Sequence, residues 1–367
     1  MTHGIRLEAG GPGDPDAVRT VTADLQPEAA SGLPAAGPRP RVSRRLLLDV
    51  RADRFSGLYL AVVLIAVFAL WLPHSFATAS SARAILADSA ITGIVTLGCV
   101  LGLISGAFDI SIGANMSLAI SLVGWLQSSL HLNALLAVIM TLASGAAVGT
   151  VNAFVITRLR VEPVIATLGM SSLLAAFAYW VAGGQTIITG ISSTFTSFGM
   201  TSLLTIPVPV FYLLGLALLL WYLLDHTPFG RYLYASGANP NAARLAGLPV
   251  ARLQWSALLM SGILSSFAGI VLTMQLGSAS FGAGDSYLLP AFAAAFLGST
   301  QIKPGRFNVA GTIVALYLLG IGVQGLQLRY PSLPWIADLF QGLALITAVA
   351  LGVIAAKQRV RRAAAYG

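Results

Sequence analysis

The sequence predicts an all-α, polytopic integral membrane protein with about ten transmembrane helices. Hydrophobic residues make up 56% of its 367 residues, charged residues make up only 9%, and the mean hydropathy is +0.82. A soluble domain has about 25% charged residues, so this composition is typical of a protein embedded in lipid. Apolar windows of roughly 20 residues recur along the chain, and helices of that length satisfy their own backbone groups inside a bilayer.

The first 50 residues have a different composition. They are rich in Pro, Gly, Ala and charged residues, and apolar residues show no helical spacing there. This composition predicts a disordered tail over residues 1–50, and the apolar core of a cleavable signal peptide is missing. A basic cluster from Arg41 to Arg54 precedes the first span and is predicted to hold the N-terminus in the cytoplasm.

The membrane domain is predicted to cover residues 51–357, and residues 358–367 to form a cytoplasmic C-terminal tail. The window 286–300 is short enough to form a re-entrant or broken helix, and residues 105–113 form only a brief Gly-rich break. A count of nine or eleven spans therefore remains open. The predicted spans lie near residues 57–73, 84–105, 113–130, 133–157, 162–183, 206–225, 252–275, 286–300, 307–327 and 335–356.

The basic residues predict the orientation of these spans. With a cytoplasmic N-terminus, 19 of the 21 Lys and Arg residues fall in inside segments, and only Arg83 and Arg329 fall outside. Cytoplasmic loops carry such an excess of positive charge. Both termini and the loop 228–250 are therefore predicted to be cytoplasmic, while residues 184–205, 276–285 and 328–334 are predicted to face outward.

The loop 228–250 is the longest water-compatible interruption between spans. Within it, Asn239 is predicted to cap a helix of about two turns, and Gly247 to end that helix in a left-handed conformation. A helix this short is not stable alone in water, so we expect it to dock against a partner. The residues assigned to this docking helix are Asn239, Pro240, Ala243, Arg244, Leu245 and Gly247.

Acidic side chains inside spans are costly in lipid and therefore informative. Asp88 and Asp338 lie within predicted spans, and Asp109 lies in the Gly-rich break between glycines and serines. A broken helix there can present backbone N–H groups to the carboxylate. Asp109 is therefore interpreted either as lining a path or gate, or as part of a helix N-cap in which Asp109 or Ser111 bonds a nearby amide, and the two roles are compatible.

Small residues recur at four-residue spacing, as in Gly145 and Gly149. Such spacing lets two helix backbones approach closely, so these glycines are predicted to serve packing.

Several other chemistries have no support in the sequence. Cys99 is the single cysteine and the histidines are scattered, so neither a disulfide nor a metal site is predicted. The net charge of +8 comes from residues between apolar spans, so nucleic acid is not an expected partner. Lys303 and Lys357 lie outside any Gly-x-x-x-x-Gly-Lys-Ser/Thr motif, so the chain is not expected to bind ATP, to be an enzyme or to need a cofactor.

Seven segments between residues 83 and 352 match one known family in order and at family-like spacing. Residues 105–113 read Ser-Gly-Ala-Phe-Asp-Ile-Ser-Ile-Gly, against a Gly-Gly-x-Asp-Leu-Ser-Val-Gly signature. The chain thus resembles the membrane subunits of ABC importers of the ribose, xylose and autoinducer-2 class. Lys303 is a departure, because that family usually has Gly in its turn before the ninth span. The other matching segments are Asn152–Leu159, Pro163–Gly169, Gly183–Gln185, Thr227–Gly247, Gly298–Thr312 and Gln341–Leu345.

The resemblance implies a type II ABC importer-like permease of a bacterial cytoplasmic (inner) membrane that translocates a monosaccharide. It also implies ABC ATP-binding subunits beneath the loop 228–250, an extracytoplasmic substrate-binding protein and a second permease copy as partners, within membrane lipid. The candidates for the translocation pathway or gate are Asp109, Ser111, Asn115, Thr167 and Gln185. The candidates for docking the binding protein are Gly184, Gln185, Phe281 and Asp285.

Three alternatives remain open on the sequence. A branched-chain amino-acid ABC permease would match in the same segments. An ion-coupled secondary transporter would use acidic groups near the bilayer midplane, although Asp88, Asp109 and Asp338 form no relay that the sequence identifies. A membrane receptor or scaffold without transport activity is the third.

Overall fold

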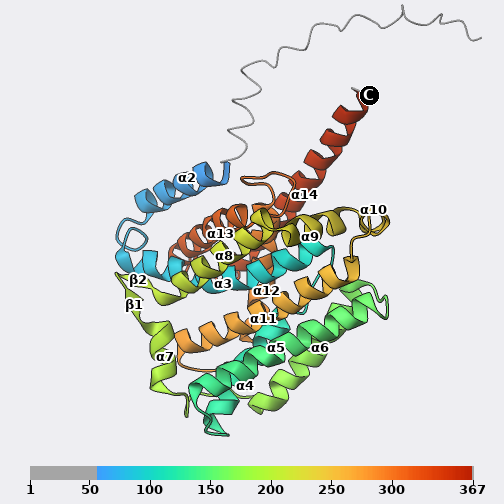
Figure 1. Ribbon diagram of the computed structural model, residues 1–367. Coiled ribbons are helices and arrows are strands. Elements are labelled where there is room, and N and C mark those ends of the chain that lie inside the picture. The colour runs from blue at the N-terminus through green and yellow to red at the C-terminus, as the bar shows by residue number, and fades with distance from the viewer. Residues whose placement is uncertain (1–55, 366–367) are drawn as a thin grey trace, which may run out of the picture. The chain divides into compact units, whose positions relative to one another are not determined.

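The computed structural model describes residues 56–365, with side chains described to residue 350. The predicted tail, residues 1–50, and the basic cluster that follows it lie outside the described residues. Figure 1 shows a bundle of helices with two very short strands. The helices are α2 (Ser56–Trp71), α3 (Ala79–Ser105), α4 (Ile112–Ser128), α5 (Ala134–Thr157), α6 (Pro163–Ala182), α7 (Ser193–Met200), α8 (Val208–His226), α9 (Pro228–Ala238), α10 (Pro240–Leu245), α11 (Val250–Leu276), α12 (Leu288–Gly298), α13 (Val309–Arg329) and α14 (Ile336–Ala365).

The remaining elements are small and lie in connections between helices. Strands β1 (Ser202–Leu203) and β2 (Ile206–Pro207) form an antiparallel pair in which Leu203 lies opposite Ile206. A 3-10 helix, η1 (Ala283–Tyr287), leads directly into α12. The all-α prediction is therefore confirmed for the described residues.

Each predicted span contains a helix, but the helices differ in length. Six of those described are long and apolar enough to cross a membrane: α3, α5, α6, α8, α11 and α13. The helix α2 and the apolar stretch Ile336–Ala350 of α14 are shorter. The window 286–300 contains the end of η1 and the 11-residue α12, which follows η1 without interruption and is shorter than the six spanning helices. The count of ten crossings stays a prediction.

The core is built around two long helices, α3 and α11. They are the most deeply buried of the spanning helices, and they pack against each other. Helix α3 also contacts α8, α12 and α13, whereas α11 contacts α4 and α5. One continuous apolar cluster joins Ile94 and Leu97 of α3 to Leu264 and Val271 of α11. These two helices therefore position the segments that flank them.

Glycines allow α5 and α11 to pack almost backbone to backbone. A Cβ on Gly262 of α11 would collide with the carbonyl oxygen of Gly145, and one on Gly149 of α5 would collide with that of Leu258. Only glycine leaves room for this approach. The packing role predicted for Gly145 and Gly149 is confirmed.

We expect Gly262→Ala to destabilise the protein, because the added methyl group meets backbone atoms that cannot rotate away. Overpacking of this kind costs about 1–3 kcal/mol. The measurement is the thermal midpoint of the detergent-solubilised chain. Gly215→Ala on α8 is the matched control, because no atom lies within 4 Å of its added methyl group and Ala favours helix. Equal midpoints for the two variants would contradict the packing argument.

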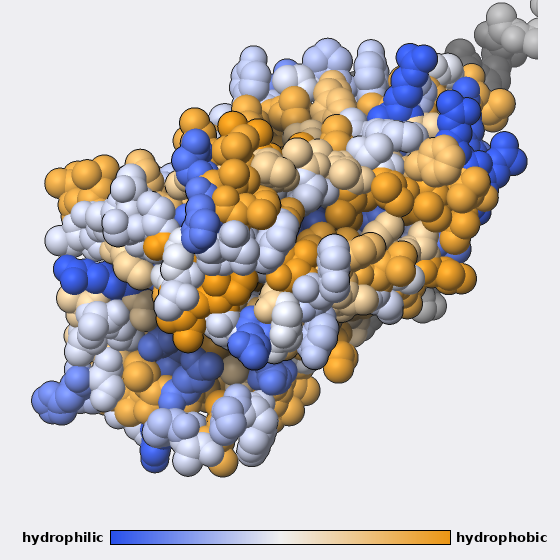
Figure 2. Space-filling view, turned by 90° about the horizontal axis from the view of Figure 1, so that it is seen from below, coloured by the Kyte–Doolittle hydropathy of each residue, from blue (hydrophilic) through white to orange (hydrophobic). Residues whose placement is uncertain are grey.

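The outer surface of the helices is largely apolar. Figure 2 shows hydrophobic side chains reaching the surface over much of the face drawn, with hydrophilic side chains at separated points. Helix α6 is an example, since Leu173, Phe177 and Trp180 are exposed. A soluble protein rarely exposes so much contiguous apolar surface, whereas a protein surrounded by lipid does.

Candidate functional site

The loop 228–250 contains the predicted capped helix. The side-chain oxygen of Asn239 accepts a hydrogen bond from Ala242 N at 3.0 Å, and Pro240 occupies the first turn of α10. Gly247 has φ +79° and donates its N–H to Arg244 O at 2.9 Å. The cap and the stop are confirmed, and the six-residue helix is close to the predicted two turns, since one turn takes about 3.6 residues.

A second helix, α9, precedes α10 and was not predicted from the sequence. It begins at Pro228, directly after α8, and packs against α3, α8 and α11. Gly237 makes this packing possible, because a Cβ there would collide with the carbonyl oxygen of Ile104 at the end of α3. The loop is therefore a helical hairpin seated on the core and not an independent segment.

The hairpin leaves two neighbouring side chains of α10 free toward solvent. Leu245 is 91% exposed, and Arg244 is exposed and donates to Asn241 Oδ1 at 3.2 Å within its own helix. Ala243, on the opposite side, is buried and holds α10 to the protein. This pair is suited to contact with another protein, because arginine is enriched in protein interfaces and the exposed leucine offers apolar surface beside it.

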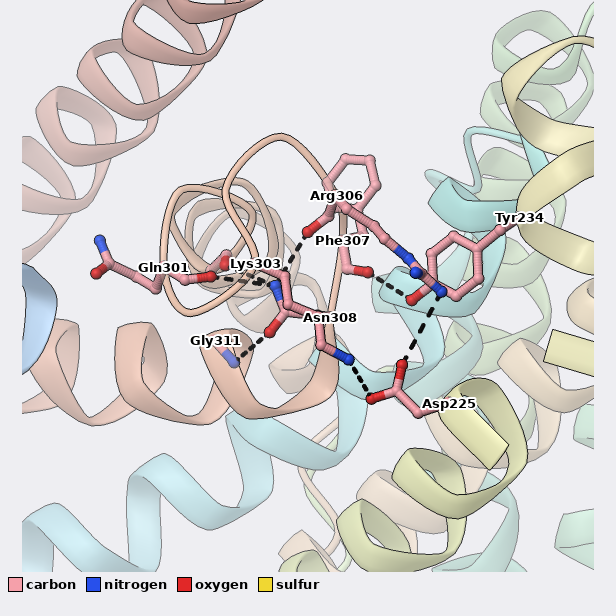
Figure 3. Close-up of polar contacts among 9 residues, drawn as sticks. Asp225, Tyr234, Gln301, Lys303, Arg306, Phe307, Asn308 and Gly311 are labelled. Carbon is pink, nitrogen blue, oxygen red and sulfur yellow. Dashed lines mark hydrogen bonds and ion pairs between the residues drawn. The ribbon is translucent and has the colours of Figure 1, made fainter. Parts of the chain in front are cut away.

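A polar cluster fastens the hairpin to the turn that precedes α13 (Figure 3). Lys303 Nζ lies 2.6 Å from Asp225 Oδ2 at the end of α8, and Arg306 Nη2 lies 3.9 Å from Asp225 Oδ1. The Arg306 guanidinium also lies 3.5 Å above the ring centre of Tyr234 on α9. Tyr234 donates its hydroxyl to Phe307 O at 2.6 Å. Together these contacts tie α8, α9 and the turn into one joint.

Tyr234 acts in this joint as a neutral donor. Burial raises the pKa of its hydroxyl, and the nearby charge of Arg306 lowers it. A tyrosine with a raised pKa keeps its proton at neutral pH and continues to donate. The joint therefore keeps its hydrogen bond throughout the physiological range.

Asn308 shapes the turn that carries Lys303 and Arg306. Its side-chain oxygen accepts from Gly311 N at 2.7 Å and caps α13, while its Nδ2 donates to Arg306 O at 3.0 Å and Gln301 O at 3.2 Å. Gln301 Oε1 in turn accepts from Gly57 N of α2 at 2.7 Å. The structure gives Lys303 of this turn the carboxylate of Asp225 as a partner.

We expect Lys303→Asp to weaken the joint, because it places two carboxylates side by side. Lys303 is 40% and Asp225 16% exposed, so solvent screening limits the effect to about 1 kcal/mol or less. Combining it with Asp225→Lys restores part of the stability, but not all, since Arg306 then faces a positive charge. A double-mutant cycle of thermal midpoints measures the coupling. Strictly additive effects of the two substitutions would show that this ion pair contributes nothing.

Asp109 lies in the break between α3 and α4 and is 4% exposed. Its Oδ1 accepts from Ser111 N at 3.0 Å and from Ser111 Oγ at 2.6 Å, and its Oδ2 accepts from Ser261 Oγ of α11 at 3.2 Å. The prediction that Asp109 bonds a nearby amide is confirmed. Ser111 itself makes no side-chain cap to α4, but its hydroxyl accepts from Asn152 Nδ2 of α5 at 2.8 Å.

Thr167 and Asn115 belong to the same buried region. Thr167 Oγ1 of α6 accepts from Ile110 N at 3.1 Å and donates to Pro163 O at 2.8 Å. Asn115 Nδ2 of α4 donates to Gly262 O of α11 at 2.8 Å. Four of the five pathway candidates are thus brought together around the break, where they bond to α5, α6 and α11. Gln185, the fifth, lies apart in an exposed loop.

Three of the four predicted docking residues lie on two loops that the structure joins, and the fourth, Asp285, lies in η1. Ile187 and Ala279 exchange backbone hydrogen bonds of 2.9 and 2.8 Å, which pairs the loop after α6 with the loop after α11. The Phe281 ring packs edge-on against the Tyr179 ring, with 5.6 Å between the ring centres, and Gly184 lies against the same tyrosine. Gln185, the residue after Gly184, is exposed. Asp285 lies beside Gly113 at the start of α4.

Some residues of these clusters were missed by sequence reasoning. Asn152, Ser261 and Tyr234 hold the break and the joint, but nothing in their sequence spacing connects them to Asp109 or Arg306. Asn152 could have been found, since it is a lone amide within an apolar helix. No group of three or more His, Cys, Asp or Glu residues that could hold a metal occurs among residues 56–350.

Comparison with known proteins places the chain in a family. The family model for the permease component of branched-chain amino acid transport systems matches residues 81–349. The chain belongs to this family. The family description makes this chain a permease component of a transport system.

Characterised relatives of the permease include importers of two solutes. It is 35% identical to the ribose import permease protein RbsC of Escherichia coli K12 over 274 residues, which are 73% of this chain and 84% of the relative. It is 33% identical to RbsC of Bacillus subtilis over 299 residues, or 81% and 91% of the two chains. It is 32% identical to the autoinducer 2 import system permease protein LsrD of Escherichia coli O9:H4 over 280 residues, or 75% and 84%. No solved structure matches the permease. The resemblance inferred from the sequence motifs is confirmed.

Proposed function

We propose that this permease is the membrane subunit of an ATP-driven ABC importer for a monosaccharide similar to ribose or xylose. The observation that carries the proposal is the α9–α10 hairpin, whose exposed Arg244 and Leu245 are suited to a partner, on a chain with relatives that import ribose. The ATP-binding subunit would contact this pair, and its closure would push α10. Because α10 is joined to α9, and α9 to α3 and α8, such a push reaches the core.

The joint at Asp225 would transmit a displacement of α9 to a second part of the protein. Tyr234 on α9 contacts Arg306 and Phe307, so a displaced α9 pulls on the turn between α12 and α13. Figure 3 shows these side chains converging from three segments. We infer that α12 and α13 follow the movement of α9 during the transport cycle.

The remaining assignments of this proposal concern orientation and partners. The loop 228–250 and both termini face the cytoplasm, in a bacterial inner membrane, and the paired loops after α6 and α11 receive the binding protein. Two copies of the permease form a homodimer, as the family resemblance implies, and α6 presents an apolar face that a second copy or lipid would cover. Asp109, Ser111, Asn115, Thr167 and Gln185 remain the candidates for the pathway.

The test is uptake by a complex assembled from this permease and the ATPase and binding protein that co-purify with it from native membranes. In proteoliposomes, we expect ATP-dependent accumulation of radiolabelled D-ribose or D-xylose that requires the binding protein. Recovery of no ATPase subunit, or uptake that persists without ATP and stops with a protonophore, would favour the ion-coupled alternative and overturn the proposal.

A second candidate function is branched-chain amino-acid import, because the matching family model carries that description. Radiolabelled L-leucine in the same vesicles separates the two. Accumulation of leucine without ribose or xylose would assign the permease to amino acids.

A further inference from the structure

A cavity with both polar and apolar walls opens between four helices, at a place that none of the features described so far occupies. It has a volume of about 320 Å³ and is lined by α3, by η1 with the start of α12, by the second half of α13 and by the start of α14. This volume is at the lower end of the range of small-molecule sites, about 300–1,000 Å³. The polar side chains that line it include Asp88, Tyr287, Gln324, Gln327, Asp338 and Gln341.

The position of the cavity suits a solute that enters from outside. It lies near the N-terminal ends of α3 and α14 and the C-terminal end of α13, so it is at the opposite end of α13 from the joint at Lys303. In the orientation predicted from the basic residues, this end is extracytoplasmic. Gln275, at the end of α11, donates to Asp88 Oδ1 at 3.4 Å, and α11 leads into the loop that pairs with Ile187.

The lining chemistry selects among possible ligands. Three glutamines supply both donors and acceptors, and two aspartates supply acceptors, which together match the hydroxyl groups of a polyol. An amino-acid carboxylate would meet two acidic side chains and no Lys or Arg among the described lining residues. A bare cation needs several oxygen ligands at about 2–2.6 Å, and no cluster of three acidic or His residues occurs in the described part of the chain.

We propose that the cavity between α3, α12, α13 and α14 is a binding site for a neutral polyhydroxylated solute of monosaccharide size, held chiefly by Asp338, Gln324 and Gln341. The proposal rests on the proposed transport function and adds a site to it. The solute occupies the cavity in its ring form after leaving the binding protein. Tyr287 supplies an aromatic wall, and the aspartates accept hydrogen bonds from vicinal hydroxyl groups.

The first test is protection of an engineered thiol by sugar, in the assembled complex with the full-length chain. Cys99 is only 2% exposed, so the reactive thiol is one introduced by Val323→Cys, which lines the cavity without removing a polar side chain. We expect 10 mM D-ribose to slow its labelling by a water-soluble thiol reagent at least threefold. Ser332→Cys, an exposed position in the turn between α13 and α14 and outside the cavity, is the control and keeps its rate. Equal labelling with and without ribose, or no labelling at all, would overturn the proposal.

The second test separates this site from the transport function as a whole. We expect Asp338→Asn combined with Gln324→Leu to lower ribose uptake at least tenfold, while ATP hydrolysis stimulated by the loaded binding protein stays within twofold of the unmodified complex. Thr347→Val is the control for uptake. Unchanged uptake in the double variant would refute the cavity site and leave the importer function standing. If the unmodified complex neither transports nor hydrolyses ATP, the proposed function itself has failed.

Discussion

Combining Arg244→Glu with Leu245→Asp is expected to abolish ATP-driven uptake while the protein remains folded. Both side chains are exposed on α10, and Leu245 at 91% has almost no intramolecular contact to lose. The two side chains would matter for binding instead, because an arginine or apolar side chain buried in an interface can contribute about 2 kcal/mol or more to the binding free energy. Losing two such anchors and adding two negative charges weakens binding by about two to three orders of magnitude.

The measurement is ATP hydrolysis stimulated by the loaded binding protein, together with recovery of the ATPase subunit on the tagged permease. A matched control lies in the turn between α5 and α6, where Arg158 and Leu159 form the same dipeptide and are also exposed. Both pairs are predicted to face the cytoplasm. We expect Arg158→Glu combined with Leu159→Asp to retain most of the activity. Full coupling in a correctly inserted α10 variant would remove the hairpin from the mechanism.

The contrast between α10 and α9 shows what local sequence can predict. The cap at Asn239 and the left-handed stop at Gly247 depend on the residues themselves, and both are present. Helix α9 depends instead on the contact of Gly230 with Leu224 and of Gly237 with Ile104. Gly237 and Ile104 are far apart in the sequence, so their contact could not be predicted from local residues. The stretch 228–238, which contains two glycines, is therefore interpreted as a loop when only the sequence is considered.

The acidic residues show the same limit. Asp109 was identified because its neighbours are glycine and serine, and its bond to the Ser111 amide is local. Its other partner, Ser261, is 152 positions away, and only the packing of α3 against α11 brings it there. Nothing in the sequence indicates that Asp88 and Asp338 lie near each other. Both line one cavity, because α3 and α14 each contact α12.

The second large effect is expected for Asp109→Leu, which removes the acceptor that holds the break between α3 and α4. Three donors lose their partner: Ser111 N, Ser111 Oγ and Ser261 Oγ. A buried donor left unpaired costs about 1–3 kcal/mol. In lipid a side-chain hydrogen bond averages about 0.6 kcal/mol, because the unfolded chain also finds partners there. A total loss of roughly 2–5 kcal/mol lies between these limits.

The fraction of monodisperse protein that survives heating in detergent measures this loss, and Asp109→Asn is the matched control. The amide keeps an oxygen that accepts from Ser111, and its NH₂ group can donate to the Ser261 hydroxyl, so we expect near-normal stability. The same variant tests the pathway role, because it removes only the charge. Asp109 is 4% exposed and both its oxygens are bonded, so uptake is expected to stay within about threefold of normal. Normal stability of Asp109→Leu would show that the break is held by Thr167 and Asn115 instead, and a stable Asn variant without uptake would make the carboxylate part of the pathway.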